Sequence, residues 1–356
     1  MIQELQYYLT QVDCGVFASG TLGANVKGFT DIEDLSHVDV FLLSIPDARG
    51  DGFSMQVRKE LYSLFSHFNV SICDLGCLKI GNSLSDTLHS YRFVSEQIRR
   101  IGKLLLVLDT HCFVDLLALN QENNLSAKTV IFNNSFRYPT FSGESTHLLS
   151  LAGSSTSFIG LQNFLSSQED YSQAADANIT LYRLGEVIEH TKSIEPVLRD
   201  TSSGFASLAV LERSTDFKVS GGSVNGISIH NLCQLFYYAG RSRSMNLFVI
   251  DGSSFCRATS EGYLASLIAQ NAWQFLLGRA QVLAFDKSAN SYKSYYISHF
   301  HDDVDFCFYE DLALKIWWLE ISIGTSTSVI AATYDDYKKM QDGEIPKVVA
   351  HALSKK

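Results

Sequence analysis

Proline and charged residues are scarce in this sequence, and their scarcity excludes a largely disordered chain. Only 4 prolines occur among 356 residues, and 19% of the residues are charged against 46% that are hydrophobic. No segment is low in complexity, so the chain can bury a substantial core as one large domain or two ordinary ones. Because so few charges cover the surface, we expect part of it to be buried in a homo-oligomer.

The sequence lacks a block of Lys and Arg, a secretory leader and a long apolar run. Its formal net charge is -10, and an anionic protein repels phosphate backbones, so no nucleic-acid partner is expected. The first eight residues contain Glu4 and two glutamines instead of an apolar leader segment. The longest apolar run, 101–119, is interrupted by Asp109, His111 and Asp115. A bilayer span needs about 18–20 apolar residues, so no membrane span is expected.

The cysteines do not form the pattern of a disulfide framework. Seven are spread through the chain, and an odd number in a large chain is typical of reduced thiols in a cytosolic protein. Cys73 and Cys77 have the spacing of half a zinc site, but no second Cys or His pair matches them. We interpret both as structural residues and predict a cytoplasmic location.

Short apolar runs alternate with longer stretches of helical spacing along most of the chain. Strands are predicted at 38–45, 70–75, 103–108, 129–132, 157–159, 207–211 and 247–250, and helices at 56–68, 86–100, 229–239 and 259–277. Strands that are apolar on both faces and alternate with helices indicate a parallel sheet covered on both sides. The pattern therefore predicts a doubly wound α/β fold.

The pattern changes after residue 285. Antiparallel strands are predicted at 292–297, 304–309 and 315–323, followed by a short helix at 334–340. No linker separates this part from the rest. We therefore divide the chain into an α/β domain at 1–285 and a C-terminal extension at 286–356 that packs on the same domain.

Several segments, in conserved order along nearly the whole chain, carry a family resemblance. They are VDVFLLSIPDARGDG (38–52), DLGCLKIGNSLSDT (74–87), LYRLGEVIEHTKSIEPVLRD (181–200), VNGISIHNLCQLFYYAG (224–240), and the tail segments IWWLEI (316–321) and YDDYKKMQDGEIP (334–346). Together they resemble a divergent Bacteroidetes-type, arginase-like branch of the arginase/agmatinase/formimidoylglutamase (ureohydrolase) family. The resemblance implies a three-layer αβα arginase-like fold with a parallel sheet, plus a small C-terminal β-rich extension.

The resemblance also implies where a metal centre should lie. In active members of the family, a hydroxide bridging two manganese ions attacks a guanidino or formimino carbon. Such hard cations need carboxylates and imidazoles at the C-terminal ends of parallel strands. The family carries them in a Gly-Gly-Asp-His run, an Asp-x-His-x-Asp run and a Ser-x-Asp-x-Asp run.

None of these three motifs keeps its ligands in this sequence. In the first, Asp109 and Thr110 stand on the glycines and Cys112 on the histidine, although His111 is adjacent. On the three ligand positions of the second motif stand Asn133, Ser135 and Arg137. When the third motif is aligned on Arg213, its ligand positions become Leu208 and Val210. The segment 131–140 contains no Asp, Glu or His, and a cationic Arg137 in the cleft would repel a metal ion.

We therefore predict a catalytically inactive pseudoenzyme with a ureohydrolase fold, acting as a binding or scaffold protein. No catalytic, cofactor-binding or metal-binding residue is assigned, and no cofactor is expected. Candidate partners are a small molecule in the vestigial cleft, further copies of this chain, and an unidentified protein. Cys112 is interpreted as a buried, inert thiol rather than a nucleophile.

Two alternatives remain open. The first is a manganese-dependent hydrolase of linear amidines with atypical ligands such as His111 and Asp251, since the family has an acidic residue near the position of Asp251. The second is a metal-binding module formed by His299, His301, Asp303 and Asp305, which would share one face of a strand. An exposed polar hairpin is the favoured interpretation of that stretch.

Overall fold

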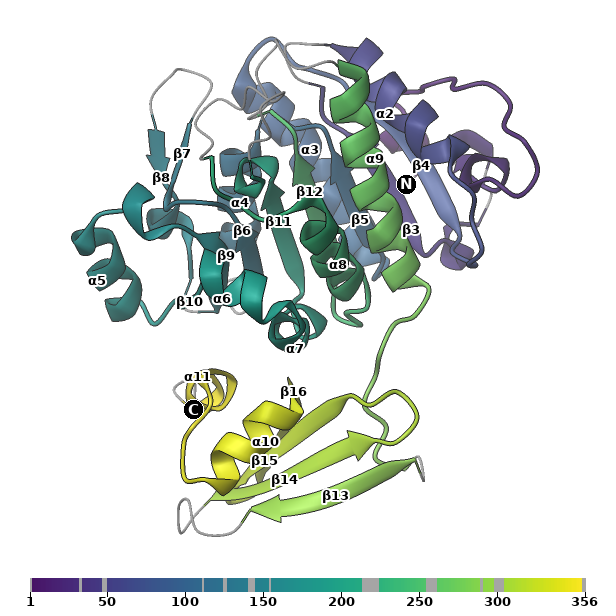
Figure 1. The fold of residues 1–356 in the computed structure, drawn as a ribbon. Helices are drawn as coiled ribbons and strands as arrows, with labels where there is room; N and C mark the ends of the chain where they lie inside the picture. Colours follow the sequence, from purple (N-terminus) through teal and green to yellow (C-terminus); the bar gives the residue numbers. More distant parts are fainter. Residues whose placement is uncertain are drawn as a thin grey trace.

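The structure is a computed structural model that describes residues 2–31, 34–46, 50–110, 112–123, 127–139, 145–153, 155–212, 224–253, 261–288, 291–297 and 304–353. A ten-stranded, mostly parallel sheet forms its centre (Figure 1). The strands run in the order β1-β4-β3-β5-β12-β11-β6-β9-β10, with β1 antiparallel at one edge and β2 paired to β4. Their bounds are β1 Leu9–Thr10, β2 Lys27–Gly28, β3 Val40–Ser44, β4 Ile72–Leu78, β5 Leu104–Leu108, β6 Thr129–Phe132, β9 Thr156–Leu161, β10 Thr180–Arg183, β11 Ser203–Ser207 and β12 Leu247–Asp251.

Helices cover both faces of this sheet. Val40 and Leu42 of β3 pack into one apolar cluster, whereas Phe41 and Leu43 pack into another, as expected when successive side chains point to opposite faces. Helices α2, α8 and α9 contribute to the first cluster and α3 and α4 to the second, and Figure 1 shows them in front of and behind the sheet. The helix bounds are α1 Ile2–Leu5, α2 Asp51–Ser63, α3 Leu84–Arg100, α4 Phe113–Asn123, α5 Gln168–Asp176, α6 Leu184–Glu189, α7 Glu195–Arg199, α8 Ile229–Gly240 and α9 Glu261–Arg279. The predicted three-layer α/β fold is confirmed.

A second sheet follows the first. Strands β13 (Tyr292–Ile297), β14 (Val304–Asp311), β15 (Trp317–Ile323) and β16 (Ser326–Ala332) pair in sequential antiparallel order, followed by α10 (Tyr334–Gln341) and α11 (Lys347–Leu353). This sheet has an apolar core of its own around Phe308, Trp317 and Leu319. It lies beneath the main sheet in Figure 1, next to α7. Of the helices in the described ranges, none is both long and apolar enough to cross a lipid bilayer.

The strand predicted at 207–211 is wrong. The strand β11 ends at Ser207, and Leu208–Val210 form a 3-10 helix. The true strand, Ser203–Ser207, contains residues with weak strand propensity. Gly204 is required there because a Cβ would lie 2.4 Å from the Phe248 ring, so packing between neighbouring strands places β11 where local preference does not. The helix predicted at 56–68 is also shifted, since α2 ends at Ser63.

Candidate functional site

Four polar residues lie side by side where the central parallel strands end. Asp109 follows β5, Asn133 follows β6, Ser207 ends β11 and Asp251 ends β12. In the pairing of β11 with β12, Ser207 lies opposite Asp251. This edge is where ligands bind in open α/β sheets, yet each of the four residues is at most 1% exposed.

Asp109 occupies a backbone conformation that favours glycine. Its φ is 58°, in the left-handed region that aspartate tolerates better than most residues. Its backbone N–H donates to the Ile250 carbonyl at 3.1 Å, and its carboxylate accepts from the Ser54 hydroxyl at 2.7 Å. Asp109 therefore forms a left-handed turn on a position where the family resemblance implies a glycine.

Asp251 is held by a tyrosine from a distant part of the chain. The Tyr138 hydroxyl donates to Asp251 in a short hydrogen bond and lies 3.0 Å from the Ser253 hydroxyl. The Ser253 backbone N–H also donates to Asp251, at 3.1 Å. Burial and the charge of Asp251 raise the pKa of Tyr138, so its hydroxyl keeps its proton and remains a donor. The Tyr138 ring stacks on Phe113 with 4.7 Å between centroids.

The residues on the second motif bond to backbone carbonyls. The Asn133 amide nitrogen donates to the carbonyls of Ser135 and Arg137 at 2.9 and 3.2 Å, and the Asn134 amide nitrogen donates to Ala209 at 3.0 Å. These bonds tie the end of β6 to the two-stranded hairpin β7 (Arg137–Pro139) and β8 (Ser145–His147) and to the segment after β11. Arg137, at the start of β7, is exposed, and the repulsion of a metal ion by its charge stays a prediction.

The residues on the third motif belong to the hydrophobic core. Leu208 and Val210 are 0% exposed and pack in the same apolar cluster as Leu232 of α8. Ser207 accepts from the Ala209 backbone N–H at 3.2 Å, which begins the 3-10 helix. Side chains that are buried among hydrocarbon offer no oxygen or nitrogen to a cation.

The cysteines at and near this edge are buried. Cys112 is 1% exposed, and burial raises its pKa to about 12, so its thiol stays protonated at neutral pH and is a poor nucleophile. Cys73 and Cys77 are both buried in β4, as expected for structural residues. His111, Arg213, His299, His301 and Asp303 lie outside the described residues; Asp305 is exposed at the start of β14.

In the part of the chain that the structure describes, the possible metal ligands at this edge do not fit a pair of manganese ions. Such a pair needs several carboxylates and imidazoles around two cations. The edge supplies the carboxylates of Asp109 and Asp251, and each accepts a hydrogen bond from a protein hydroxyl. Among the residues that the structure describes, no group of three or more His, Cys, Asp or Glu side chains could hold a metal ion.

Sequence reasoning missed Tyr138, Ser54 and Ser253. Tyr138 and Asp251 are 113 residues apart, and Ser54 is a helix residue 55 positions before Asp109. No spacing or motif marks these residues as partners. Only the arrangement of strand ends and the β7–β8 hairpin brings them together.

Replacing Tyr138 with phenylalanine is expected to destabilise the chain by about 1–3 kcal/mol, because a buried carboxylate loses a hydrogen-bond donor. Urea unfolding monitored by circular dichroism measures the change. Tyr296→Phe is the matched control, since Tyr296 is 78% exposed and its substitution is expected to change stability by less than about 0.5 kcal/mol. Equal stabilities of the two variants would contradict the assigned role of Tyr138.

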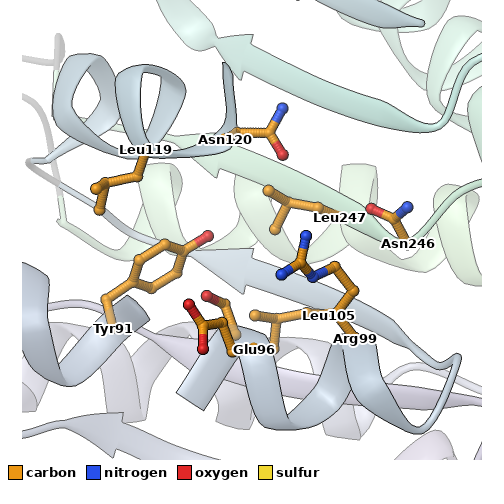
Figure 2. Close-up of a pocket in the computed structure, with 9 residues that line it drawn as sticks. Tyr91, Glu96, Arg99, Leu105, Leu119, Asn120, Asn246 and Leu247 are labelled. Atoms are coloured by element: carbon orange, nitrogen blue, oxygen red, sulfur yellow. The ribbon is translucent and has the colours of Figure 1, made fainter. Parts of the chain in front are cut away.

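A small cavity lies at the opposite edge of the sheet. It is lined by Leu105 at the start of β5, Leu247 at the start of β12, and polar residues that include Arg99 and Asn246 (Figure 2). Its volume is about 40 Å³, far below the few hundred Å³ of ordinary ligand sites. It is therefore too small to be the substrate site of an enzyme.

No protein-family model matches the sequence, and the search of curated proteins finds no match. Solved structures do match. A Trypanosoma cruzi formiminoglutamase solved with Mn²⁺ is 15% identical, with a TM-score of 0.59, and the match covers 71% of this chain and 97% of that chain. A Bacillus subtilis formimidoylglutamase is 13% identical, with a TM-score of 0.62 and coverage of 79% and 98%. A Thermoplasma volcanium agmatine ureohydrolase is 14% identical, with a TM-score of 0.55 and coverage of 78% and 98%. These likenesses confirm the predicted arginase-like fold.

Proposed function

We propose that this chain, which has the fold shared by formimidoylglutamase and agmatine ureohydrolase, is a non-catalytic protein that acts by binding or as a scaffold. One observation carries the proposal. The polar side chains at the C-terminal ends of β5, β6, β11 and β12 are buried, and each makes a hydrogen bond to a protein group, although Asn133 Oδ1 has no partner among the described residues. A hydrolytic centre needs the opposite, a set of ligands that face a space shared with metal, water and substrate.

Side chains fill the space at the ends of these strands, which supports a loss of hydrolysis rather than a different catalytic mechanism. Tyr138 and Phe113 stack within the strand ends, and the Tyr138 hydroxyl takes up one oxygen of Asp251. A metal ion at Asp251 would have to displace a buried phenol. The protonated Cys112 thiol does not supply an alternative nucleophile.

Because the fold is retained, the proposed role lies in binding. Further copies of this chain, a protein partner and a small ligand are the candidate classes. No disulfide joins the cysteines that the structure describes, which supports a reducing, cytoplasmic setting for this role. Sedimentation velocity on the purified chain tests the homo-oligomer directly.

Metal analysis of the purified chain, paired with a substrate panel, tests the loss of catalysis. The chain is incubated with excess manganese, desalted and analysed, and is then assayed for urea, ammonia or formamide released from arginine, agmatine and formimidoylglutamate. We expect no stoichiometric manganese and no turnover. The formiminoglutamase from Trypanosoma cruzi, treated in the same way, serves as the positive control.

Two manganese ions per chain together with turnover would sink the proposal. The substitutions His111→Ala and Asp251→Asn would then identify the manganese-dependent amidine hydrolase with atypical ligands, since both residues are its candidate ligands. Metal that disappears in His299→Ala/His301→Ala, without turnover in the parent chain, would instead identify the metal-binding module. The assay therefore separates the three functions.

A further inference from the structure

Two arginines lie close together between the main sheet and the C-terminal sheet. Arg199 ends α7 and is 3% exposed, and Arg241 follows α8 with a side chain that is 12% exposed. One buried carboxylate, Glu195, lies between them, 3.0 Å from Arg199 Nε and 3.9 Å from Arg241 Nη1. Two guanidinium groups thus share one carboxylate in their ion pairs, and Glu195 Oε1 has no hydrogen-bond partner among the described residues.

Some N–H groups of the two guanidinium groups have no acceptor. Arg199 Nη2 donates to the carbonyls of Trp317 and Ala332 at 3.0 and 3.3 Å. Among the described residues, however, Arg199 Nη1 and Arg241 Nε have no hydrogen-bond acceptor. A buried donor left without an acceptor costs about 1–3 kcal/mol, and more for a charged group.

A third buried arginine, Arg58, shows the hydrogen bonding of an arginine with a purely structural role. Arg58 is 0% exposed, and all three of its nitrogens donate to protein acceptors, among them Asp74 and Ser44. Arg199 and Arg241 differ from it because each has a nitrogen without an acceptor. The hydrogen bonding of these two guanidinium groups is therefore less complete than that of Arg58.

Both incomplete arginines line one cavity of about 720 Å³. This volume is within the range of small-molecule sites. The cavity is formed jointly by the end of α8, the segment from 188 to 199 and the C-terminal sheet. Exposed Lys192 and Lys315 line it as well, together with exposed Glu189 and Asp335. Water screens these exposed charges, so the buried groups Arg199, Arg241 and Glu195 dominate the field inside, and their charges sum to a positive value.

We propose that this cavity binds a small molecule through an oxyanion group, a carboxylate or a phosphate, held by Arg199 and Arg241. Both oxyanions supply the acceptors that the two guanidinium groups lack, in the geometry that arginine recognises. The site lies away from the strand-end edge that holds Asp251, and it is therefore independent of the proposed loss of catalysis.

Isothermal titration calorimetry on the full chain tests the site with two probes, inorganic phosphate and glutarate. We expect saturable binding of at least one probe at one site per chain, with a Kd of about 1 mM or tighter. Phosphate binding alone identifies a phosphate site, and glutarate binding alone identifies a carboxylate site. No saturable heat with either probe overturns the proposal.

Variants of Arg241 locate the binding. Arg241→Gln is expected to weaken binding at least tenfold, and Arg241→Lys, which keeps the charge but loses the planar donors, is expected to weaken it as well. The matched control is Arg243→Gln, which removes the same charge two residues away from an exposed side chain and should leave the Kd within twofold. Circular dichroism melts verify that each variant is folded. Unchanged binding in both Arg241 variants, or an equal loss in Arg243→Gln, overturns the proposal.

Discussion

Replacing Asp74 with asparagine is expected to destabilise the folded chain by about 3–5 kcal/mol, because it leaves the fully buried Arg58 cation without its counter-charge. Arg58 is 0% exposed and Asp74 9% exposed. Two Arg58 nitrogens donate to the Asp74 carboxylate at 2.9 and 3.0 Å, and the Tyr62 hydroxyl donates to it at 2.6 Å. Asparagine keeps the shape of the side chain, so the change measures the charge.

The same pair predicts how stability depends on pH. Burial alone would raise the pKa of Asp74, but the charge of Arg58 and the hydrogen bonds from Arg58, Tyr62 and the Gly76 N–H lower it below its usual value. A carboxyl whose pKa is lower in the folded state contributes stability above its unfolded pKa of about 3.9, and this stability is lost as the pH falls through the folded pKa. Stability should therefore decline below about pH 4, and Asp74→Asn should remove this part of the decline.

An exposed ion pair supplies the control for Asp74. Arg92 and Glu122 lie 2.7 Å apart with side chains that are 43% and 64% exposed, so Glu122→Gln should cost less than about 1 kcal/mol. Urea unfolding at several pH values measures both variants. If Asp74→Asn is no more costly than Glu122→Gln, the buried pair does not stabilise the fold as argued. The double variant Arg58→Met/Asp74→Leu should recover much of the loss, because a matched apolar pair buries no charge.

The second large effect is expected from Arg199→Met, which should loosen the C-terminal sheet. Arg199 joins the two sheets, since it donates to the carbonyls of Trp317 in β15 and Ala332 in β16 and its guanidinium carbon lies 4.1 Å from the centre of the Trp318 ring. Methionine has a similar length but no donors, and it leaves Glu195 buried with a weaker partner. We expect a loss of about 3–5 kcal/mol.

Hydrogen exchange shows whether this loss is local. Amides of β15 and β16 should exchange faster in Arg199→Met, while amides of β5 and β12 should change less, because the C-terminal sheet can open without the main sheet. Lys347→Met is the control, since Lys347 also links the two parts, through Glu186 at 2.7 Å, but is 56% exposed. It should cost less than about 1 kcal/mol. Equal exchange in the two variants would contradict the role of Arg199.

Local patterns in the sequence are sufficient to predict most strands and helices of the main sheet and its covering layers. The apolar runs at 103–108 and 247–250 became β5 and β12 almost without shift, because strands buried on both faces need such runs. Helix α3 begins at a capping box in which Ser83 and Asp86 satisfy each other's backbone N–H groups, a pattern that depends on residues three positions apart. The antiparallel tail was also predicted, although its last strand, β16, was missed.

Trp317 and Trp318 show a feature that the sequence does not predict, namely which of two adjacent side chains faces the main sheet. Both are buried. Trp317 packs among tail aromatics such as Tyr337, whereas Trp318 receives the Arg199 guanidinium. Adjacent residues of a strand face opposite sides, but which side meets α7 depends on how the two sheets dock.

The sequence by itself determined that this chain is an α/β protein with the arginase fold, and the resemblance implies that Leu208 and Val210 stand on metal-ligand positions of the family. Periodicity and residue identity are local, so they can be read without coordinates. Only the tertiary structure decided what surrounds the ends of the central strands. The bond between Tyr138 and Asp251, the pair of Arg58 and Asp74, and the incomplete pair of Arg199 and Arg241 all join distant elements, and burial, which sets the strength of each interaction, exists only in the folded chain.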